Sequence, residues 1–126
     1  MQGYLYSWCV DPLDGTKEFI KRNGQFTVNI ALLRGSEPVM GVVQIPCEDK
    51  VYWAAKGQGA FVRVAGIDTR ISAASFEPST PGLVIVGSAS HSTAETEEFV
   101  AEYASPVFKQ LGSSLKLLMV RACVCA

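Results

Sequence analysis

The sequence has 126 residues, of which 48% are apolar and 18% charged, and its net charge at pH 7 is −1. This composition is typical of a globular chain and excludes disordered and low-complexity classes. It provides no basic surface for a nucleic acid or an anionic membrane. We therefore expect neither as a partner, and a polyanionic substrate would have to be held by local features or a bound cation.

The sequence indicates an intracellular, soluble protein. Its four cysteines, Cys9, Cys47, Cys123 and Cys125, do not have the spacing of a zinc site, and we expect reduced thiols. The first ten residues are too short and lack the basic start of a signal peptide. No apolar run approaches the ~20 residues of a membrane span. The compartment and the oligomeric state stay open.

Short strands joined by turns are expected in the first half of the chain. The expected strands are 7–10, 26–33, 39–45, 51–55 and 60–64. A short helix over 17–21 follows the first of them, and Asn23-Gly24 is a turn signal. Gly35-Ser36-Glu37-Pro38 predicts another turn. Strands with connections this short predict an antiparallel meander.

The second half predicts a β-α-β-α order after a proline-containing boundary at 76–82. The continuous apolar run 83–87 is typical of a strand covered on both faces. Ser92-Thr93-Ala94-Glu95 has capping-box spacing and predicts a helix to about Tyr103. Residues 107–111 predict another strand. Gly112-Ser113-Ser114 then predicts a cap for a helix, whose apolar face would carry Leu115, Leu118, Met119 and Ala122.

These elements predict an α+β fold, with an antiparallel sheet followed by the β-α-β-α unit. Two structural units, 1–78 and 79–126, would meet near Pro78 to Pro81.

Asp11 and Asp14 are the strongest candidates for chemistry, because they lie three residues apart at the end of an apolar strand. Two carboxylates ~4 Å apart repel by about 4 kcal/mol at an effective dielectric near 20. A bound divalent cation removes this cost, and oxygen-only ligation favours Mg²⁺ over zinc. Pro12 fixes the local turn, and the carbonyl of Leu13 can supply another oxygen.

Gly15 and Thr16 follow the acids and predict an anion site at the start of the short helix. The Thr16 hydroxyl can also orient a water molecule. Cations held by the acids would attract a phosphate held by the amides, which is the logic of metal-assisted phosphate ester hydrolysis. From the spacing alone, a solvated Asp-Gly turn remains the alternative.

The segment 8–19, Trp-Cys-Val-Asp-Pro-Leu-Asp-Gly-Thr-Lys-Glu-Phe, resembles the first metal signature of the inositol monophosphatase superfamily. The resemblance continues through 26–32 and 41–43 and covers roughly 7–120. It implies a piece of the layered αβαβα sugar-phosphatase fold and Mg²⁺ as the cofactor.

Three segments resemble the 3′(2′),5′-bisphosphate nucleotidase branch in particular: 17–21, 88–91 and 112–116. The resemblance implies removal of the 3′-phosphate of 3′-phosphoadenosine 5′-phosphate, a small phosphorylated nucleotide, to give AMP and phosphate.

The resemblance also implies roles for individual residues. The metal ligands would be Asp11, the carbonyl of Leu13, and Asp14. The catalytic set would be Asp11, Asp14 and Thr16. The substrate would contact Gly15, Thr16, His91, Ser113 and Lys116. Without the resemblance, each residue has an ordinary interpretation. Lys116 would be a solvated helix lysine, His91 a loop or capping histidine, and Ser113 a helix cap.

Two parts of the family pattern are absent from the sequence: an upstream acidic pair in a Gly-Glu-Glu context, and a downstream Trp-Asp motif. The resemblance therefore implies a chain truncated at both ends, with exposed apolar surface, marginal stability and weak or no activity. The alternatives are an inositol phosphate phosphatase and a non-catalytic binding fragment.

Overall fold

The computed structural model describes residues 4–88, 93–119 and 121–124, with side chains described up to 119. Its strands are β1 (Tyr6–Asp14), β2 (Thr27–Arg34), β3 (Glu37–Ile45), β4 (Lys50–Ala55), β5 (Gly59–Val64), β6 (Ile67–Ala73), β7 (Val84–Ser88), β8 (Val107–Leu111) and β9 (Arg121–Val124). Its helices are α1 (Thr16–Ile20), α2 (Ala94–Ala101) and α3 (Leu115–Met119), with a 3₁₀ turn at Pro46–Glu48.

The first five strands form the predicted antiparallel meander, β6 extends it, and β9 completes a seven-stranded sheet in the order β1-β2-β3-β4-β5-β6-β9. The sequence analysis missed β6. Its signal in the sequence is the alternation of Ile67, Thr69 and Ile71 after Ala65-Gly66. In the structure these two residues form the turn between β5 and β6, and both have positive φ, as a two-residue hairpin turn requires.

Pro38 lies inside β3, where the sequence predicted a turn. It pairs with Leu33 next to an irregularity in the β2–β3 register. Proline has no amide hydrogen for the ladder, and a bulge is one of the places where a sheet tolerates it.

The predicted β-α-β-α order is confirmed by β7, α2, β8 and α3. Strands β7 and β8 pair in parallel as a separate two-stranded sheet. The expectation that β7 is covered on both faces is wrong at its start, where Val84 is 46% exposed, because so small a sheet leaves part of its surface uncovered. The N-cap of α2 is Thr93, whose hydroxyl accepts from Thr96 N at 3.3 Å; Ser92 lies outside the described residues.

The last helix is shorter than predicted. It ends at Met119, and Ala122 belongs to β9 instead of the helix face. Strand β9 pairs with β6, so the backbone after α3 satisfies the free edge of the large sheet. The proposed division into units at 78/79 stays a prediction.

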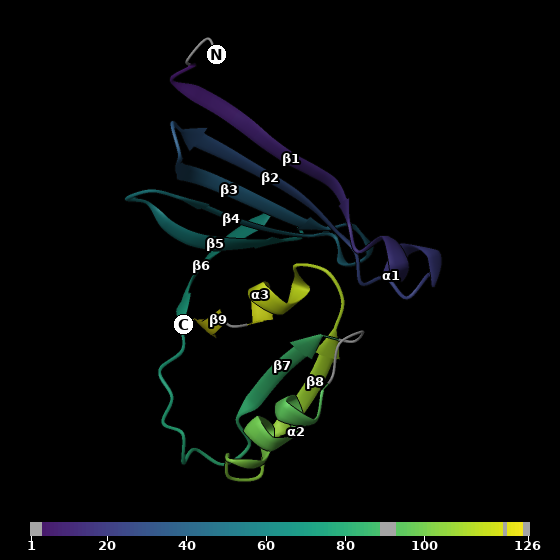
Figure 1. Cartoon of the computed structure of the whole chain (residues 1–126). Coiled ribbons are helices and arrows are strands. Elements are labelled where there is room, and N and C mark those ends of the chain that lie inside the picture. The colour runs from purple at the N-terminus through teal and green to yellow at the C-terminus, as the bar shows by residue number, and fades with distance from the viewer. Residues whose placement is uncertain (1–3, 89–92, 120, 125–126) are drawn as a thin grey trace.

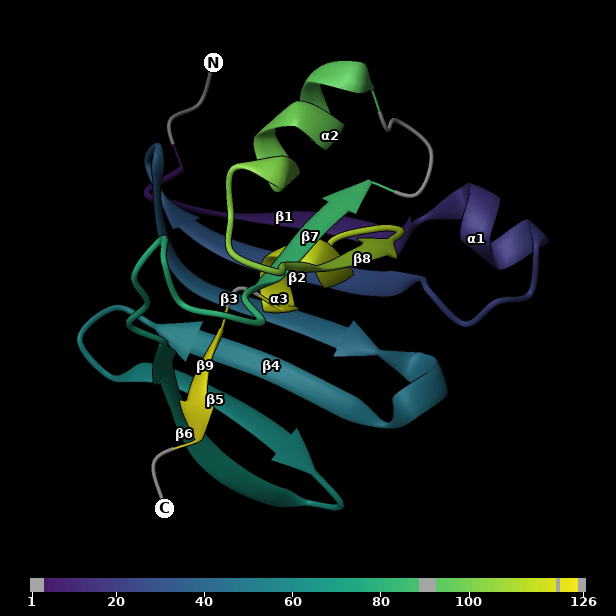
Figure 2. The same ribbon diagram turned by 90° about the horizontal axis from the view of Figure 1, so that it is seen from below.

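Helix α3 and the small sheet with α2 lie on one side of the large sheet (Figures 1 and 2). The buried core lies where α3 meets this face. It consists of Ile45, Tyr52, Val62 and Leu115, with Leu118 packed against it.

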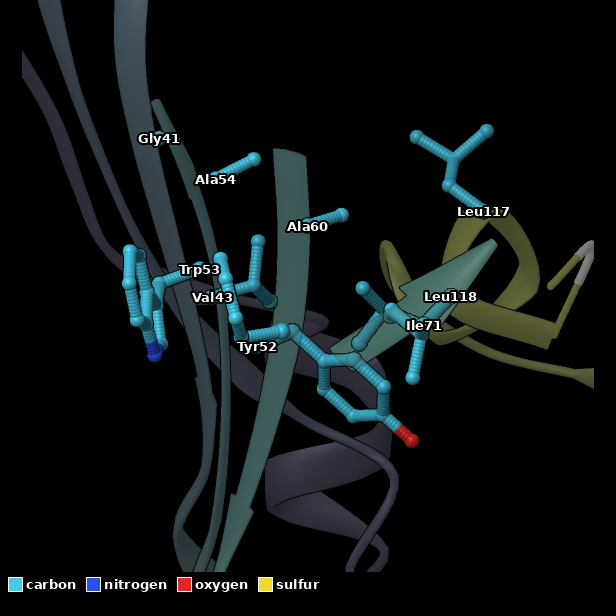
Figure 3. A pocket seen from close by; sticks show the side chains of 10 residues that line it. Gly41, Val43, Tyr52, Trp53, Ala54, Ala60, Ile71, Leu117 and Leu118 are labelled. Carbon is cyan, nitrogen blue, oxygen red and sulfur yellow. The ribbon is translucent and has the colours of Figure 1, made fainter. Parts of the chain in front are cut away.

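An apolar cavity of about 280 Å³ adjoins the core. In Figure 3, Tyr52 and Ile71 point toward α3, whereas Trp53 points to the other side of the sheet.

The opposite face of the large sheet is not covered by any element that the structure describes (Figure 1), and its first strand exposes apolar side chains there. Trp8 and Val10 are 61% and 54% exposed. Trp53 and Phe61 stack on the same face, with ring centroids 4.3 Å apart. The predicted exposed apolar surface is therefore present.

Cys9 and Cys47 are free and exposed. Among the described residues, no helix is long and apolar enough to cross a membrane.

An ion pair on the open face gives a pH-dependent prediction. Hydrogen bonds from Arg63, and then from Trp53, hold the pKa of Asp68 below its ordinary value. A lowered folded-state pKa stabilises the fold above the unfolded pKa, and this stability is lost as pH falls through the folded value. We expect Asp68→Asn to lower the melting temperature by roughly 2 °C at pH 7 and by a smaller amount at about pH 3, below the ordinary aspartate pKa. Circular dichroism melts at both pH values test this; an equal loss at both would contradict it.

Candidate active site

A bulge near the end of β1 puts both candidate carboxylates on one face of the sheet. Asp11 pairs with Asn29 and Asp14 with Thr27, so three residue steps on β1 oppose two on β2. Residues three apart in a regular strand point to opposite faces, and the extra residue of the bulge cancels this alternation. Asp11 Oδ1 accepts from Leu13 N at 3.2 Å and holds the bulge. Both acids consequently share the α3 face with Thr27 and Asn29.

Asp14 is fixed by donors from two distant parts of the chain. Its Oδ2 accepts from Ser114 N at 2.6 Å, and it lies 3.4 Å from both Thr27 Oγ1 and Asn29 Nδ2. The bond from Ser114 spans 100 residues and connects the loop before α3 to the end of β1. A carboxylate that receives an amide at this distance makes a charge-assisted hydrogen bond, which is among the stronger types.

The loop 112–114 is held against the large sheet and α1. Gly112 N donates to Gln25 Oε1 at 2.9 Å. Lys116 Nζ donates to the carbonyls of Ser113, at 2.9 Å, and Leu111, at 3.4 Å. The Lys116 ammonium therefore links the two ends of this loop through hydrogen bonds, and its third hydrogen can be donated to a ligand. Ser113 Oγ accepts from Leu115 N at 3.3 Å, so Ser113 also has the predicted capping contact.

Five of the predicted site residues line one cavity of about 560 Å³ between α1 and the loop before α3. They are Asp14, Gly15, Thr16, Ser113 and Lys116. Asp11 and Leu13 do not line it and lie on the bulge beside it. His91 lies outside the described residues.

Gly15 allows the close approach of β1 and the α3 loop. Its φ is +92°, and a Cβ at this position would lie 3.0 Å from Ser113 Cβ and from the carbonyl oxygen of Gln25. Only glycine adopts this backbone without strain while leaving space for both neighbours.

Glu18 is a carboxylate of this cavity that the sequence analysis did not select. It is 6% exposed and lines the cavity from α1. Gly112 lies directly against it, since a Cβ on Gly112 would be 2.3 Å from Glu18 Cγ. Lys17 and Lys116 line the same cavity as Glu18. The carboxylate therefore offsets part of the positive charge that these lysines offer to an anion.

Thr27 and Asn29 were also missed, although a signal exists for them. They are polar residues two apart in the strand 27–34, which is otherwise apolar until Arg34. A period of two places both on the same face of a strand. Two polar residues together on a buried face predict a shared hydrogen-bond partner.

The donor atoms at the end of β1 fit a hard cation. All are oxygens, and Asp14 Oδ1 makes no hydrogen bond to any described residue. The described part of the chain contains no group of three or more His, Cys, Asp or Glu that could hold a metal. Mg²⁺ commonly binds through one or two carboxylates and completes its shell with water and substrate phosphate oxygens. The described side chains therefore fit one Mg²⁺ rather than a closed cage for several ions.

Comparison with known proteins agrees with this geometry. The sequence profile of the inositol monophosphatase family matches residues 4–125. The 3′(2′),5′-bisphosphate nucleotidase CysQ of Escherichia coli K12 is 44% identical over 113 residues, which are 90% of this chain and 44% of CysQ. A fructose-1,6-bisphosphatase/inositol-1-monophosphatase of Aquifex aeolicus is 50% identical over 60 residues, 48% of this chain and 23% of that protein.

The crystal structure of CysQ from Bacteroides thetaiotaomicron superposes with a TM-score of 0.75 at 37% identity. The match covers 94% of this chain and 49% of that one, so the chain spans about half the length of the relatives it matches. The predicted mixed α+β fold is confirmed by this match. With residues 4–125 matched by the family profile, the chain belongs to the inositol monophosphatase family.

Proposed function

We propose that this site belongs to a magnesium-dependent phosphomonoester hydrolase that removes the 3′-phosphate of 3′-phosphoadenosine 5′-phosphate. The observation that carries the proposal is the convergence of Asp14 with Ser113 and Lys116 in one cavity. A carboxylate that fits a cation thereby lies in the same cavity as hydroxyl and ammonium groups suited to a phosphate. The similarity to two proteins named CysQ, both over 90% or more of this chain, supports the nucleotide as the substrate.

Asp11 and Asp14 would hold Mg²⁺, with the carbonyl of Leu13 as a further oxygen donor. The ion would supply Lewis-acid polarisation of the phosphoryl group and a lowered pKa for a bound water molecule. The position of Thr16 at the cavity wall suits it to orient the attacking water. Water adds to phosphorus while the bond from phosphorus to the 3′ oxygen breaks, and a proton of the water ends on that oxygen.

The remaining groups would position the substrate. Ser113, which lies against Gly15, and Lys116 line the same cavity and can contact the second phosphate. His91 would contact the nucleotide. Placing the phosphate and the water in line converts the reaction into an effectively intramolecular one, which is a large part of catalysis in such sites.

Phosphate release from two substrates tests the proposal. The chain is incubated with Mg²⁺ and equal concentrations of 3′-phosphoadenosine 5′-phosphate or inositol monophosphate, and E. coli CysQ serves as the positive control. We expect slow release by this chain that depends on Mg²⁺ and is roughly tenfold faster from the nucleotide, the effect of about 1.4 kcal/mol in transition-state binding.

A second candidate, an inositol phosphate phosphatase, is favoured by the name of the Aquifex relative, which is 50% identical over part of the chain. Faster release from inositol monophosphate would establish this candidate instead. A third outcome, heat of binding for Mg²⁺ and nucleotide without phosphate release, would identify a non-catalytic binding protein.

A further inference from the structure

The two carboxylate oxygens of Asp14 have different surroundings. Oδ2 receives the Ser114 amide and lies near the Thr27 hydroxyl and the Asn29 amide. Oδ1 has no hydrogen-bond partner among the described residues. A carboxylate held through one oxygen in this way has a fixed rotation, and its second oxygen has a fixed direction.

The hydrogens of the surrounding side chains can be assigned by counting donors. Thr27 Oγ1 and Ser114 Oγ lie 2.7 Å apart, and Ser114 Oγ lies 2.9 Å from Asn29 Oδ1. Each hydroxyl has a single proton. Because Asn29 Oδ1 can only accept, the Ser114 proton goes to Asn29. The Thr27 proton then satisfies Ser114, and the Asn29 amide donates to Asp14.

The resulting chain of bonds runs in one direction, from Thr27 through Ser114 and Asn29 to Asp14. Its starting point is fully buried, since Thr27 is 0% exposed. Water cannot replace a hydroxyl at that depth, and members of a buried network depend on one another for their geometry. The network also joins β2 to the loop before α3 across 85 and 87 residues of sequence.

From this arrangement we propose that Thr27, Asn29 and Ser114 are positioning residues that hold Asp14 with Oδ1 turned toward the cation. The inference rests on the proposed function, because it takes Asp14 as a ligand of Mg²⁺. None of the three residues contacts the cation in this scheme. They act as the partners that orient a metal ligand, whose removal typically weakens metal affinity 10–100-fold.

A merely structural network would stabilise the fold without affecting the metal. Thermal stability alone cannot separate the two roles, because removing any buried hydrogen bond destabilises a protein. Metal affinity and its rescue by a conservative variant do separate them. The probe is Mn²⁺ alone, followed through the electron paramagnetic resonance signal of the free ion, so the test does not depend on catalysis.

Four variants of the full chain are compared with the wild type. Thr27→Val removes the first hydroxyl with little change in shape, and Thr27→Ser retains it. Asn29→Leu removes the donor to Asp14. Thr69→Val in β6 makes the same exchange at a half-buried position far from the site, and it is the matched control. Circular dichroism melts confirm that each variant is folded at the temperature of the titration.

We expect Thr27→Val and Asn29→Leu each to raise the Mn²⁺ dissociation constant by about 10- to 100-fold. The double variant should lose much less than the product of the two, because both changes break one network. Thr27→Ser should stay within about threefold of the wild type, as should Thr69→Val, since both leave the network's hydroxyl in place.

If the wild type binds Mn²⁺ and Thr27→Val has the same Mn²⁺ dissociation constant, this inference is overturned and the proposed metal site is left intact. Loss of affinity in Thr27→Ser to the same extent as in Thr27→Val would also overturn it, because packing rather than the hydroxyl would then be responsible. Absence of Mn²⁺ binding by the wild type would overturn the proposed metal site itself, and this inference with it.

Discussion

Asp14→Asn is expected to abolish Mg²⁺-dependent phosphate release and to weaken Mg²⁺ binding by more than 100-fold. The substituted asparagine keeps the shape of the side chain, and its amide oxygen can still accept from Ser114 N. The substitution removes the charge of the oxygen that faces no donor among the described residues. A change in the surroundings of a ligand typically costs 10–100-fold in affinity, so loss of the ligand's own charge should exceed that range.

The effect should also be visible in stability. In the wild type, Mg²⁺ at 100 times its dissociation constant adds about 2.7 kcal/mol to the free energy of unfolding, which is on the order of 10 °C in melting temperature for a chain of this size. The metal-dependent rise should disappear in Asp14→Asn. Without metal, the melting temperature should change little, because the lost repulsion between Asp11 and Asp14 is offset by the weaker hydrogen bond that a neutral amide accepts from Ser114 N.

Asp49→Asn is the matched control, since Asp49 is an exposed acid in a left-handed turn that asparagine tolerates. It should retain the metal-dependent rise in melting temperature. Equal Mg²⁺-dependent stabilisation of Asp14→Asn and the wild type would contradict the assignment of Asp14 as a metal ligand.

The sheet was predictable from the sequence because its signals are local. Alternating β-branched residues in 27–33 and the turns at Asn23-Gly24 and Ala65-Gly66 involve neighbours in sequence. The second of these turns was overlooked, and β6 was missed with it. The end of α3 was less predictable. Ala122 continues the helical spacing of Leu115 and Leu118, but pairing with the edge of β6 takes the chain out of the helix. Such tertiary pairing overrides local preference.

The site was predicted only where its residues are contiguous. Asp11 to Thr16 form a recognisable motif, and the acids do lie beside a cavity of the right chemistry. The donors to Asp14 come from β2 and from the loop before α3, up to 100 residues away. No periodicity in the sequence connects such positions. The β1 bulge, which puts Asp11 and Asp14 on one face, becomes visible only when the register with β2 is known.

Gly112→Ala is expected to destabilise the chain by about 1–3 kcal/mol, the usual cost of overpacking a filled site. Gly112 has no positive φ, so the effect would be steric rather than conformational. Its new methyl group would lie 2.3 Å from Glu18 Cγ and 2.5 Å from Cδ, distances that require the buried Glu18 side chain to move. Displacement of Glu18 would in turn disturb the cavity wall that it forms with Ser113 and Lys116.

Removing Glu18 should relieve the clash, so the double variant Glu18→Ala/Gly112→Ala distinguishes this contact from a general effect on the loop. Chemical denaturation of the wild type, both single variants and the double variant should give a favourable coupling of about 0.5–3 kcal/mol. Gly41→Ala in β3 is the matched control, since a Cβ there meets no atom within 4 Å and its φ is not positive; it should cost little. Equal destabilisation by Gly112→Ala with and without Glu18 would show that the loop before α3 is held by contacts other than this one. The hydrogen bond from Gly112 N to Gln25 Oε1 would then be the next to test.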